Sequence, residues 1–500
     1  MFLLRFTFEN HKSFRDEVDL TMVSPSLKTN VPKEGSWSDH STRVAAIYGA
    51  NASGKSCVLD ALRFFQTSIR SSAPASKKRK TLPQHPFALD DESRSRTSTY
   101  VLDFVLEGIR HEYGFVMSRK RFEEEWLYTF PTGRKRVLFE RSADPSKLTY
   151  GRELGGGGPQ LARTTSSREL VLSNARLAKH PTLLPIGDAL VDGIDIASFG
   201  ESDRKNRLRS VIRDVADGSL SMDNLRTMLR VADIGIMDAE VEDAQADPGV
   251  VTMFRALMKV GQTAFAKVSD DEDNNDVRDN DEASSAAVQE GSESSAPEPG
   301  PDTKDTGDGD EEDELDASGL TDEEVERIYV EMSRSLMFKH AGAGDKGYDL
   351  PSDDQSTGTL TWLSLAAPAI ATIRKGGVLA VDELDASLHP QLAQVMIQMF
   401  RDESINTAGA QLIFTTHDTY FMSPTSDVKL QPEEIWFVEK DRQGVSDLFR
   451  LSDFPTRGDQ NLSRRYLQGR YGAVPSVAPS FLAALTQAAA DETSKERELV

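Results

Sequence analysis

The strongest constraint on this fold is a glycine-bearing loop that lies between an apolar run and an amphipathic stretch. The apolar run, Val44–Tyr48, has the length and character of a buried strand. Beyond the loop, apolar residues recur at helical spacing: Val58, Leu62, Phe65 and Ile69. The loop fits the pattern G-x-x-x-x-G-K-[ST] and consists of Gly49, Ala50, Asn51, Ala52, Ser53, Gly54, Lys55 and Ser56. A strand, such a loop and a helix in this order predict an α/β domain that cradles phosphate groups.

Two side chains of this loop carry its chemistry. We expect Lys55 to reach the β- and γ-phosphates of a nucleotide, and the Ser56 hydroxyl to bind Mg²⁺. A chance glycine loop is the alternative, and the strand and helix on either side disfavour it.

A second apolar run ends in two carboxylates. Gly377–Val381 predicts a buried strand that delivers Asp382 and Glu383 at its C-terminal edge. We expect Asp382 to hold Mg²⁺, directly or through water, and Glu383 to orient and deprotonate an attacking water. Apolar runs that end in Asp-Glu are also common as structural features, so this interpretation depends on the phosphate loop.

Two histidines follow the carboxylates. The loop Asp385–Pro390 leads into a helix, because Pro390 suits a first helical turn, and His389 is there a helix-entry residue rather than a ligand. In Gln411–Asp418 a strand places His417 at its end. A structural role is the ordinary interpretation of one histidine, but the position on the next strand favours contact with the terminal phosphate.

The spacing of these motifs separates the chain from simple mononucleotide-binding domains. About 320 residues lie between the phosphate loop and the carboxylate pair. Shortly before the carboxylates, Gln355–Thr359 forms a Ser/Thr/Gly turn that leads into an apolar, helix-like run. The first N–H groups of such a helix would suit an anion. The candidate residues of this turn are Ser356, Thr357 and Gly358.

The net charge of −23 is concentrated in one segment. Residues 270–316 hold 20 acidic and two basic residues, a net −18, which leaves −5 for the rest of the chain. The acidity therefore excludes no class of partner, and so polar a tract is expected to be disordered.

Cysteine content and hydropathy indicate the compartment. One cysteine, Cys57, excludes a disulfide framework and a cysteine-based zinc site. No stretch approaches 18 apolar residues, and the first ten residues lack the apolar core of a signal peptide. We therefore expect no transmembrane helix and a cytoplasmic location.

The order of the motifs resembles that of the ABC-type ATPases, specifically the SMC-like soluble branch. The chain is most similar to stand-alone ATPases of abortive-infection and anti-phage defence loci, relatives of the overcoming-lysogenisation-defect proteins. The resemblance covers about residues 1–120 and 328–475. Beyond the phosphate loop it includes Glu9–Phe14, Val381–Pro390 and Tyr466–Pro475.

The resemblance implies an α/β fold: an ABC-type P-loop ATPase head split between the two chain ends, with a helical insertion lobe and a disordered acidic insert. The expected segments are the N-terminal half of the head at 1–150, the helical lobe at 151–268, the acidic linker at 269–318, the C-terminal half at 319–475 and a tail at 476–500.

The resemblance also implies roles for particular residues. The phosphate loop binds ATP, Asp382 is the magnesium ligand and Glu383 the catalytic base. His417 is the switch histidine, and Asp385 lies in the loop between two sites. Ser356, Thr357 and Gly358 form the signature that covers the ATP of a second copy, so at least a homodimer is implied. Two more residues, Lys12 and Ser13, are expected near the nucleotide.

The chain departs from the family pattern in three ways. The signature reads Ser-Thr-Gly-Thr instead of Leu-Ser-Gly-Gly-Gln. For the glutamine that completes the magnesium shell, Gln84 is the one candidate, and otherwise it is a loop residue. Many relatives carry a Toprim nuclease domain, whereas the 83 residues after His417 hold no Asp-x-Asp pair. We therefore expect the nuclease or toxin to be a separate effector protein.

The leading function is an ATP-binding and hydrolysing switch whose paired state is read by an effector or by DNA or RNA. A rival is an SMC-like DNA repair or replication clamp, for which the basic clusters Lys77–Lys80 and Arg119–Arg121 would contact phosphates. A transporter ATPase subunit is a third class, which the acidic insert and the signature disfavour. The acidic insert could be a solvated spacer, a DNA mimic or a site for a basic partner.

Overall fold

The computed structural model describes residues 1–27, 31–32, 34–75, 81–142, 148–198, 200–232, 235–243, 253, 322–342, 346–386, 388–455 and 461–473. Two compact units are formed, one by Met1–Glu240 with Met337–Val500 and one by Val241–Leu336. The expected acidic linker at 269–318, the tail at 476–500 and the basic cluster Lys77–Lys80 lie outside the described residues.

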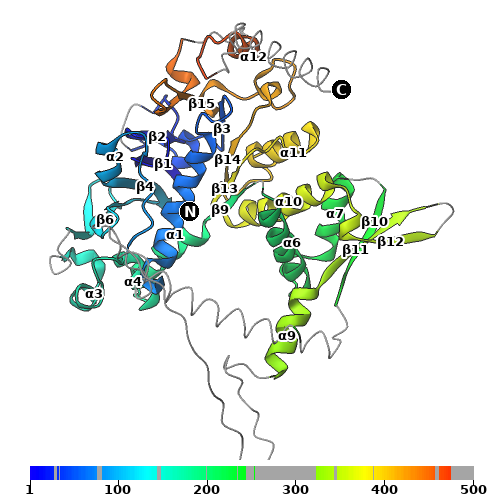
Figure 1. The fold of residues 1–500 in the computed structure, drawn as a ribbon, viewed down its shortest axis with the longest axis horizontal. Coiled ribbons are helices and arrows are strands. Elements are labelled where there is room, and N and C mark those ends of the chain that lie inside the picture. Colours follow the sequence, from blue (N-terminus) through cyan, green and yellow to red (C-terminus); the bar gives the residue numbers. More distant parts are fainter. Residues whose placement is uncertain are drawn as a thin grey trace, which may run out of the picture. The chain divides into compact units, whose positions relative to one another are not determined.

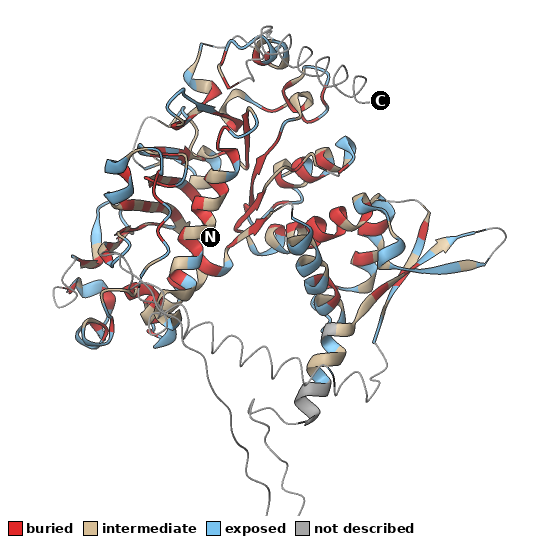
Figure 2. Cartoon of the chain, viewed as in Figure 1, coloured by how far each residue is buried: buried red, intermediate tan, exposed pale blue. Residues whose placement is uncertain are grey.

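In the first unit, a mainly parallel sheet joins strands from both ends of the chain (Figure 1). Its order is β16-β15-β3-β14-β13-β9, and β16 alone of these six runs antiparallel to its neighbour. The central strands are buried along almost their whole length (Figure 2), as expected for a sheet covered on both faces. The strands are β3 (Val44–Gly49), β9 (Ile194–Ala197), β13 (Val378–Val381), β14 (Gln411–Thr415), β15 (Ile435–Lys440) and β16 (Ser446–Arg450).

A second, antiparallel sheet of this unit has the order β2-β1-β4-β5-β6-β7-β8. The segments Tyr100–Leu106 and His111–Met117, in which apolar and polar residues alternate, form a hairpin with Glu107 and Gly108 in its turn. The strands are β1 (Phe2–Glu9), β2 (Val18–Thr21), β4 (Ser98–Leu106), β5 (Ile109–Met117), β6 (Phe122–Phe130), β7 (Arg136–Arg141) and β8 (Leu148–Tyr150).

The helix that follows the phosphate loop, α1 (Lys55–Ala75), packs against both sheets. The Phe65 ring lies 5.9 Å from Phe6 of β1 and 5.7 Å from Phe115 of β5, and shares one core with Ala45 and Ile47 of β3. This packing fixes the helix that carries the phosphate loop.

The remaining elements of the chain are mostly helices. The α-helices are α2 (Asp91–Ser95), α3 (Gly158–Thr164), α4 (Val171–Leu177), α5 (Leu183–Asp192), α6 (Glu201–Ala216), α7 (Met222–Ala232), α9 (Asp322–Ser333), α10 (Thr357–Lys375), α11 (Pro390–Arg401) and α12 (Leu462–Leu467). A small sheet has the order β10-β11-β12, with β10 (Ile236–Glu242), β11 (Ser335–Ala341) and β12 (Gly347–Pro351). Short 3₁₀ helices are Trp37–His40, Arg152–Leu154, Ser352–Asp354, Thr419–Met422, Pro432–Glu434 and Leu451–Asp453. No helix in the described ranges has both the length and the apolar character needed to cross a membrane.

At the N-terminal side of the predicted helical lobe, 151–268, the structure places residues against the head. Helices α4 and α5 pack on α1, and β9 adds a parallel strand beside β13 of the head sheet. The reason is that Ile194–Ala197 is an apolar run whose backbone pairs with Val378–Val381. Helices α4 and α5 and strand β9, which lie in the range expected for the lobe, therefore pack with the head.

A buried ion pair ties α4 to the antiparallel sheet. Glu125 of β6 is fully buried, and its carboxylate lies 3.3 Å from Nη2 of the buried Arg141. The same carboxylate accepts hydrogen bonds from the backbone N–H groups of Val171 (2.7 Å) and Leu172 (3.0 Å) and from the Tyr113 hydroxyl (2.9 Å). Burial raises the pKa of Glu125, although Arg141 and the two N–H groups favour its charged form.

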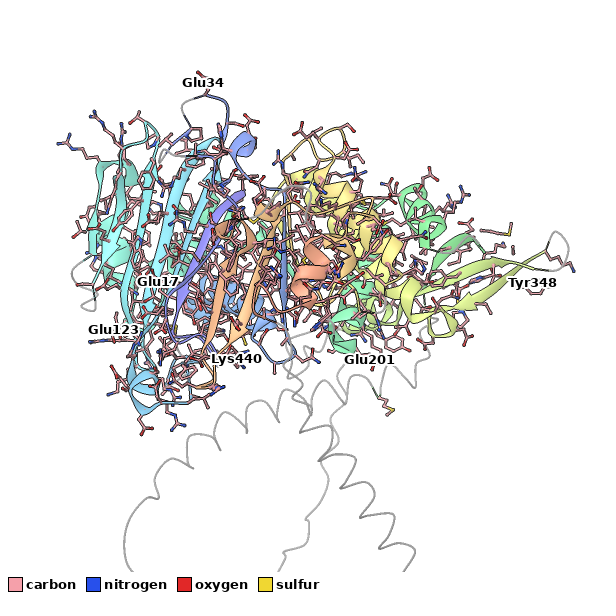
Figure 3. The ribbon with its side chains drawn as sticks, turned by 90° about the horizontal axis from the view of Figure 1, so that it is seen from above. Glu17, Glu34, Glu123, Glu201, Tyr348 and Lys440 are labelled. Carbon is pink, nitrogen blue, oxygen red and sulfur yellow. The ribbon has the colours of Figure 1, made fainter. Side chains whose placement is uncertain are left out.

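Replacing Glu125 by alanine should lower the free energy of unfolding by about 3–5 kcal/mol, because Arg141 would remain buried without its carboxylate. Urea denaturation measures this change. The control is Glu123→Ala at a residue labelled in Figure 3, which removes a partly exposed ion pair with Arg121 and should cost about 0.2–1 kcal/mol. If the two variants lost equal free energy of unfolding, the buried Glu125–Arg141 pair would not have the structural role given to it.

Candidate active site

The phosphate loop connects β3 to α1 through backbone that only particular residues adopt. Gly54 has φ 114°, and a Cβ atom there would lie 2.7 Å from both the Ser13 and the Ser446 hydroxyl. At Gly49 a Cβ atom would lie 2.5 Å from the carbonyl oxygen of Val438. Both positions therefore require glycine, and the loop can take this shape because the sequence supplies it.

Ser446 of β16 fixes the loop against the rest of the head. Its Oγ donates to the carbonyl of Ser53 (2.5 Å), and its backbone N–H donates to the carbonyl of Ser13 (2.7 Å). Ser13, predicted to be near the nucleotide, thus lies beside the phosphate loop. Sequence analysis missed Ser446, because one serine at the start of a strand gives no signal of its own.

Lys55 begins α1 and is almost fully buried. Its Nζ donates to the carbonyls of Gly49 (3.0 Å) and Ala50 (3.2 Å), so the ammonium lies within the loop. Burial lowers the pKa of Lys55, and the carboxylates of Glu383 and Asp382 oppose this effect.

The structure brings Ser56 and the carboxylate pair together. Ser56 Oγ donates to Asp382 Oδ1 at 3.0 Å. The same oxygen accepts a 2.6 Å hydrogen bond from Thr415 Oγ1, which in turn accepts the Glu383 N–H at 2.7 Å. Because β13 and β14 are parallel neighbours, their carboxyl ends meet at this edge of the sheet. Glu383 has φ 52°, a strained conformation that the surrounding hydrogen bonds maintain.

Thr415 is the functional residue that sequence analysis missed here. The available signal was a polar side chain at the end of a buried strand, next to the strand that carries Asp382. Its hydroxyl links Asp382 to the backbone of Glu383, so it orients the Asp382 carboxylate and holds the main chain of Glu383.

The two histidines lie where the sequence places them. His417 is exposed after β14, and its N–H lies 3.2 Å from Asp385 Oδ2, which joins this strand end to the loop after β13. His389 is the N-cap of α11, and its Nδ1 accepts the N–H of Gln391 at 3.3 Å. The interpretation of His389 as a helix-entry residue is confirmed.

The predicted signature turn lies at the start of α10 and not at the phosphate loop. Ser356 is the N-cap, and its Oγ accepts the N–H of Thr359 at 3.1 Å. Ser356 and Thr357 are exposed, Gly358 is partly exposed, and the hydrogen bonds of the Ser356 side chain stay within the first turn of α10. Among the hydrogen bonds of the described residues, none joins this turn to Lys55.

Comparison with known proteins identifies the family. Residues 44–153 and 254–423 match the model of the family described as "AAA domain, putative AbiEii toxin, Type IV TA system". Together these ranges span more than half of the chain. The chain belongs to this family. It is a P-loop ATPase of the AAA class whose AAA domain is split across two regions of the chain.

One solved structure that the comparison matches is described as "Crystal structure of the SmcHead bound to the C-winged helix domain of ScpA". The identity is 13%, the alignment covers 90% of this chain and 97% of that chain, and the TM-score is 0.35. A likeness of this size carries no conclusion about activity or partners. No curated protein matches the sequence.

The residues of the ATPase site fit a nucleotide with Mg²⁺. The hydroxyls of Ser13 and Ser53 are buried beside the loop, and the described residues offer them no hydrogen-bond acceptor or donor. Ser56 and Asp382 supply the oxygen ligands that Mg²⁺ prefers. We infer that these groups would hold the phosphates and the metal.

Lys12 follows β1 and pairs with Asp60 of α1, four residues beyond Ser56 of the phosphate loop. Its Nζ is 2.6 Å from Oδ2 of Asp60, which also lies 2.9 Å from Nε2 of the buried His11. Burial alone would raise the pKa of Asp60, but the hydrogen bonds and charges of His11 and Lys12 outweigh it and hold the pKa well below its usual value. Asp60 and His11 therefore position Lys12, a link that sequence analysis missed.

Gln84 is not brought to the predicted magnesium site. Its Nε2 donates to the carbonyl of Arg96 (2.8 Å) and to the Ser98 hydroxyl (3.0 Å), next to Asn10. These bonds hold the amide in the loop before β4, which agrees with the alternative of a loop residue.

Proposed function

We propose that this ATPase is a cytoplasmic ATP-binding and hydrolysing switch, in which ATP-dependent pairing of two heads controls a separate effector in bacterial anti-phage defence. The observation that carries the proposal is the convergence of Ser56, Asp382 and Glu383 beside the phosphate loop.

The chemistry follows from these positions. Mg²⁺ held by Ser56 and Asp382 would neutralise charge on the phosphates, and Lys55 would add a point charge. Glu383 orients a water and accepts its proton while the water oxygen attacks the γ-phosphorus. The bond from that phosphorus to the bridging oxygen breaks, and the products are ADP and inorganic phosphate.

Pairing is supported by the exposed signature. Ser356 and Thr357 lie on the surface at the start of α10, where N–H groups of a 19-residue helix favour an anion. Because Ser356 does not meet Lys55 within the chain, we assign it to the ATP of a second copy. A two-fold pair then forms two equivalent sites at once.

The role in defence is supported by the family description, which names a toxin of a type IV toxin–antitoxin system. The described residues of the head build an ATPase site. We therefore assign the nuclease or toxin activity to a separate effector protein. DNA or RNA that responds to the paired state is a further candidate ligand, and its affinity would then depend on salt and on ATP.

Replacing Lys55 by alanine should weaken ATP binding by about 10- to 150-fold, because a hydrogen bond to a charged group contributes about 1.5–3 kcal/mol. Isothermal titration calorimetry on the full chain measures the affinity. The control is Lys205→Ala on α6, which removes an exposed lysine paired with Glu201 and should leave ATP binding unchanged. Normal affinity in Lys55→Ala would refute the phosphate-loop assignment.

A further inference from the structure

A cavity lies along α1 from Asp60 to Ala75, and neither Asp382 nor Glu383 lines it. Its volume is about 400 Å³, within the range of small-molecule sites. The walls come from α1, from the segment 82–85 and from the adjoining ends of β5 and β6. We propose that this cavity is a second small-molecule site of the ATPase, for an anion attached to a flat ring, the chemical class of the nucleotides.

The charge of the wall favours an anion. Two cationic side chains, Lys12 and Arg63, line the cavity against one carboxylate, Asp60. Asp60 is already shared by Lys12 (2.6 Å) and His11 (2.9 Å), so the cations outweigh it. Nη2 of Arg63 donates to the carbonyl of Ile196 (3.4 Å) and the hydroxyl of Ser198 (3.2 Å), so its guanidinium is oriented before a ligand binds.

The apolar part of the wall favours a flat ring. Phe64 and the buried Phe122 line the cavity, together with the His85 imidazole, whose centroid is 5.5 Å from that of Phe64. Burial lowers the pKa of His85, with the cations Lys12 and Arg119 acting in the same direction against Asp60. His85 is therefore neutral at pH 7 and adds a third ring to the two phenyl rings.

Hydroxyl groups on α1 supply hydrogen-bond acceptors between the charged and the apolar parts. Ser68 Oγ donates to the carbonyl of Phe64 and Ser71 Oγ to that of Thr67, both at 2.8 Å. Each hydroxyl hydrogen is thereby used within the helix, and the oxygen lone pairs remain to accept from a ligand N–H or O–H. Rings, acceptors and cations in one cavity match a base, a sugar and a phosphate.

The cavity is connected to the ATPase site through one helix. Asp60 lies four residues after Ser56, and Lys12 precedes Ser13, whose hydroxyl lies beside Gly54. A ligand phosphate that attracts Lys12 would weaken its pair with Asp60, next to the phosphate loop. Occupancy of the cavity is therefore expected to alter ATP affinity.

The test uses the full chain with Lys55→Ala, which weakens the first site, and AMP as the probe in isothermal titration calorimetry. We expect one AMP per chain, bound at least about tenfold more tightly than adenosine or inorganic phosphate. Adding Thr67→Trp, which places a bulky ring at the exposed rim of the cavity, should lower the AMP affinity at least about tenfold.

The matched control is Ser202→Trp, an exposed helical position beside Glu201 (Figure 3), which should leave AMP binding unchanged. Phe64→Leu is a second variant that keeps apolar volume and removes the ring, and it should also weaken AMP binding. The proposal would be overturned if AMP did not bind, or if neither Thr67→Trp nor Phe64→Leu changed the AMP affinity. The proposed switch is tested separately, by the ATP affinity of the unsubstituted chain. It can therefore stand even if AMP does not bind the cavity.

Discussion

Replacing Glu383 by glutamine should leave ATP binding intact and slow hydrolysis by about 10²–10⁴-fold. Glutamine keeps the size and the hydrogen-bonding capacity of the side chain but cannot accept the proton of the attacking water. The backbone that holds this residue, with φ 52° and its N–H on Thr415 Oγ1, does not depend on the carboxylate. The loss should therefore appear in kcat and not in ATP affinity.

Phosphate release under saturating ATP measures this effect, with calorimetric ATP binding measured in parallel. Glu34→Gln is the matched control, since it makes the same change at an exposed residue (Figure 3) and should leave turnover unchanged. Turnover of Glu383→Gln at the level of the unsubstituted chain would mean that the carboxylate pair is structural.

The fold and the centre of the site could be predicted from local patterns. The phosphate loop, the strand before Asp382 and the helix after Pro390 each carry their signal within about ten residues, and the structure has all three. The hairpin at Glu107 and Gly108 is of the same kind, because turn residues between two alternating runs specify it locally.

The features that sequence analysis missed depend on pairing between distant segments. Whether Ile194–Ala197 joins the head sheet is decided by its register with Val378–Val381. Thr415 reaches Asp382 only because β14 and β13 are neighbours. Gln84 faces Ser98 because of the way its loop packs on β4, and no local pattern encodes this. Periodicity indicates that a strand exists but not which strand lies beside it.

Replacing Ser356 by arginine should abolish ATP-dependent pairing and turnover while leaving ATP binding to the single head nearly unchanged. The residue is exposed at the start of α10, and its own chain gives it no role at the phosphate loop. A long charged side chain there would clash with a second head. Analytical ultracentrifugation with ATP measures pairing, and Ser202→Arg on α6 is the matched surface control.

Arginine also removes the N-cap of α10, a loss of about 1 kcal/mol in stability, so a second variant separates pairing from folding. Ser356→Asp keeps an oxygen that accepts the Thr359 N–H, but sets a negative charge against the phosphates of the partner. Loss of pairing in both variants, with normal thermal unfolding of Ser356→Asp, places the effect at the interface. Normal turnover of monomeric Ser356→Arg would refute the shared site.

Mixing Ser356→Arg chains with Lys55→Ala chains gives the sharpest test of a shared site. In a mixed pair, one site combines both substitutions, and the other has Lys55 and Ser356 unchanged. At an ATP concentration too low to load the Lys55→Ala site, each variant alone is inactive, and ATPase activity should return on mixing, up to about one working site per mixed pair. If each head instead worked by itself, Ser356→Arg chains would hydrolyse ATP without mixing, and adding Lys55→Ala chains would not raise that activity.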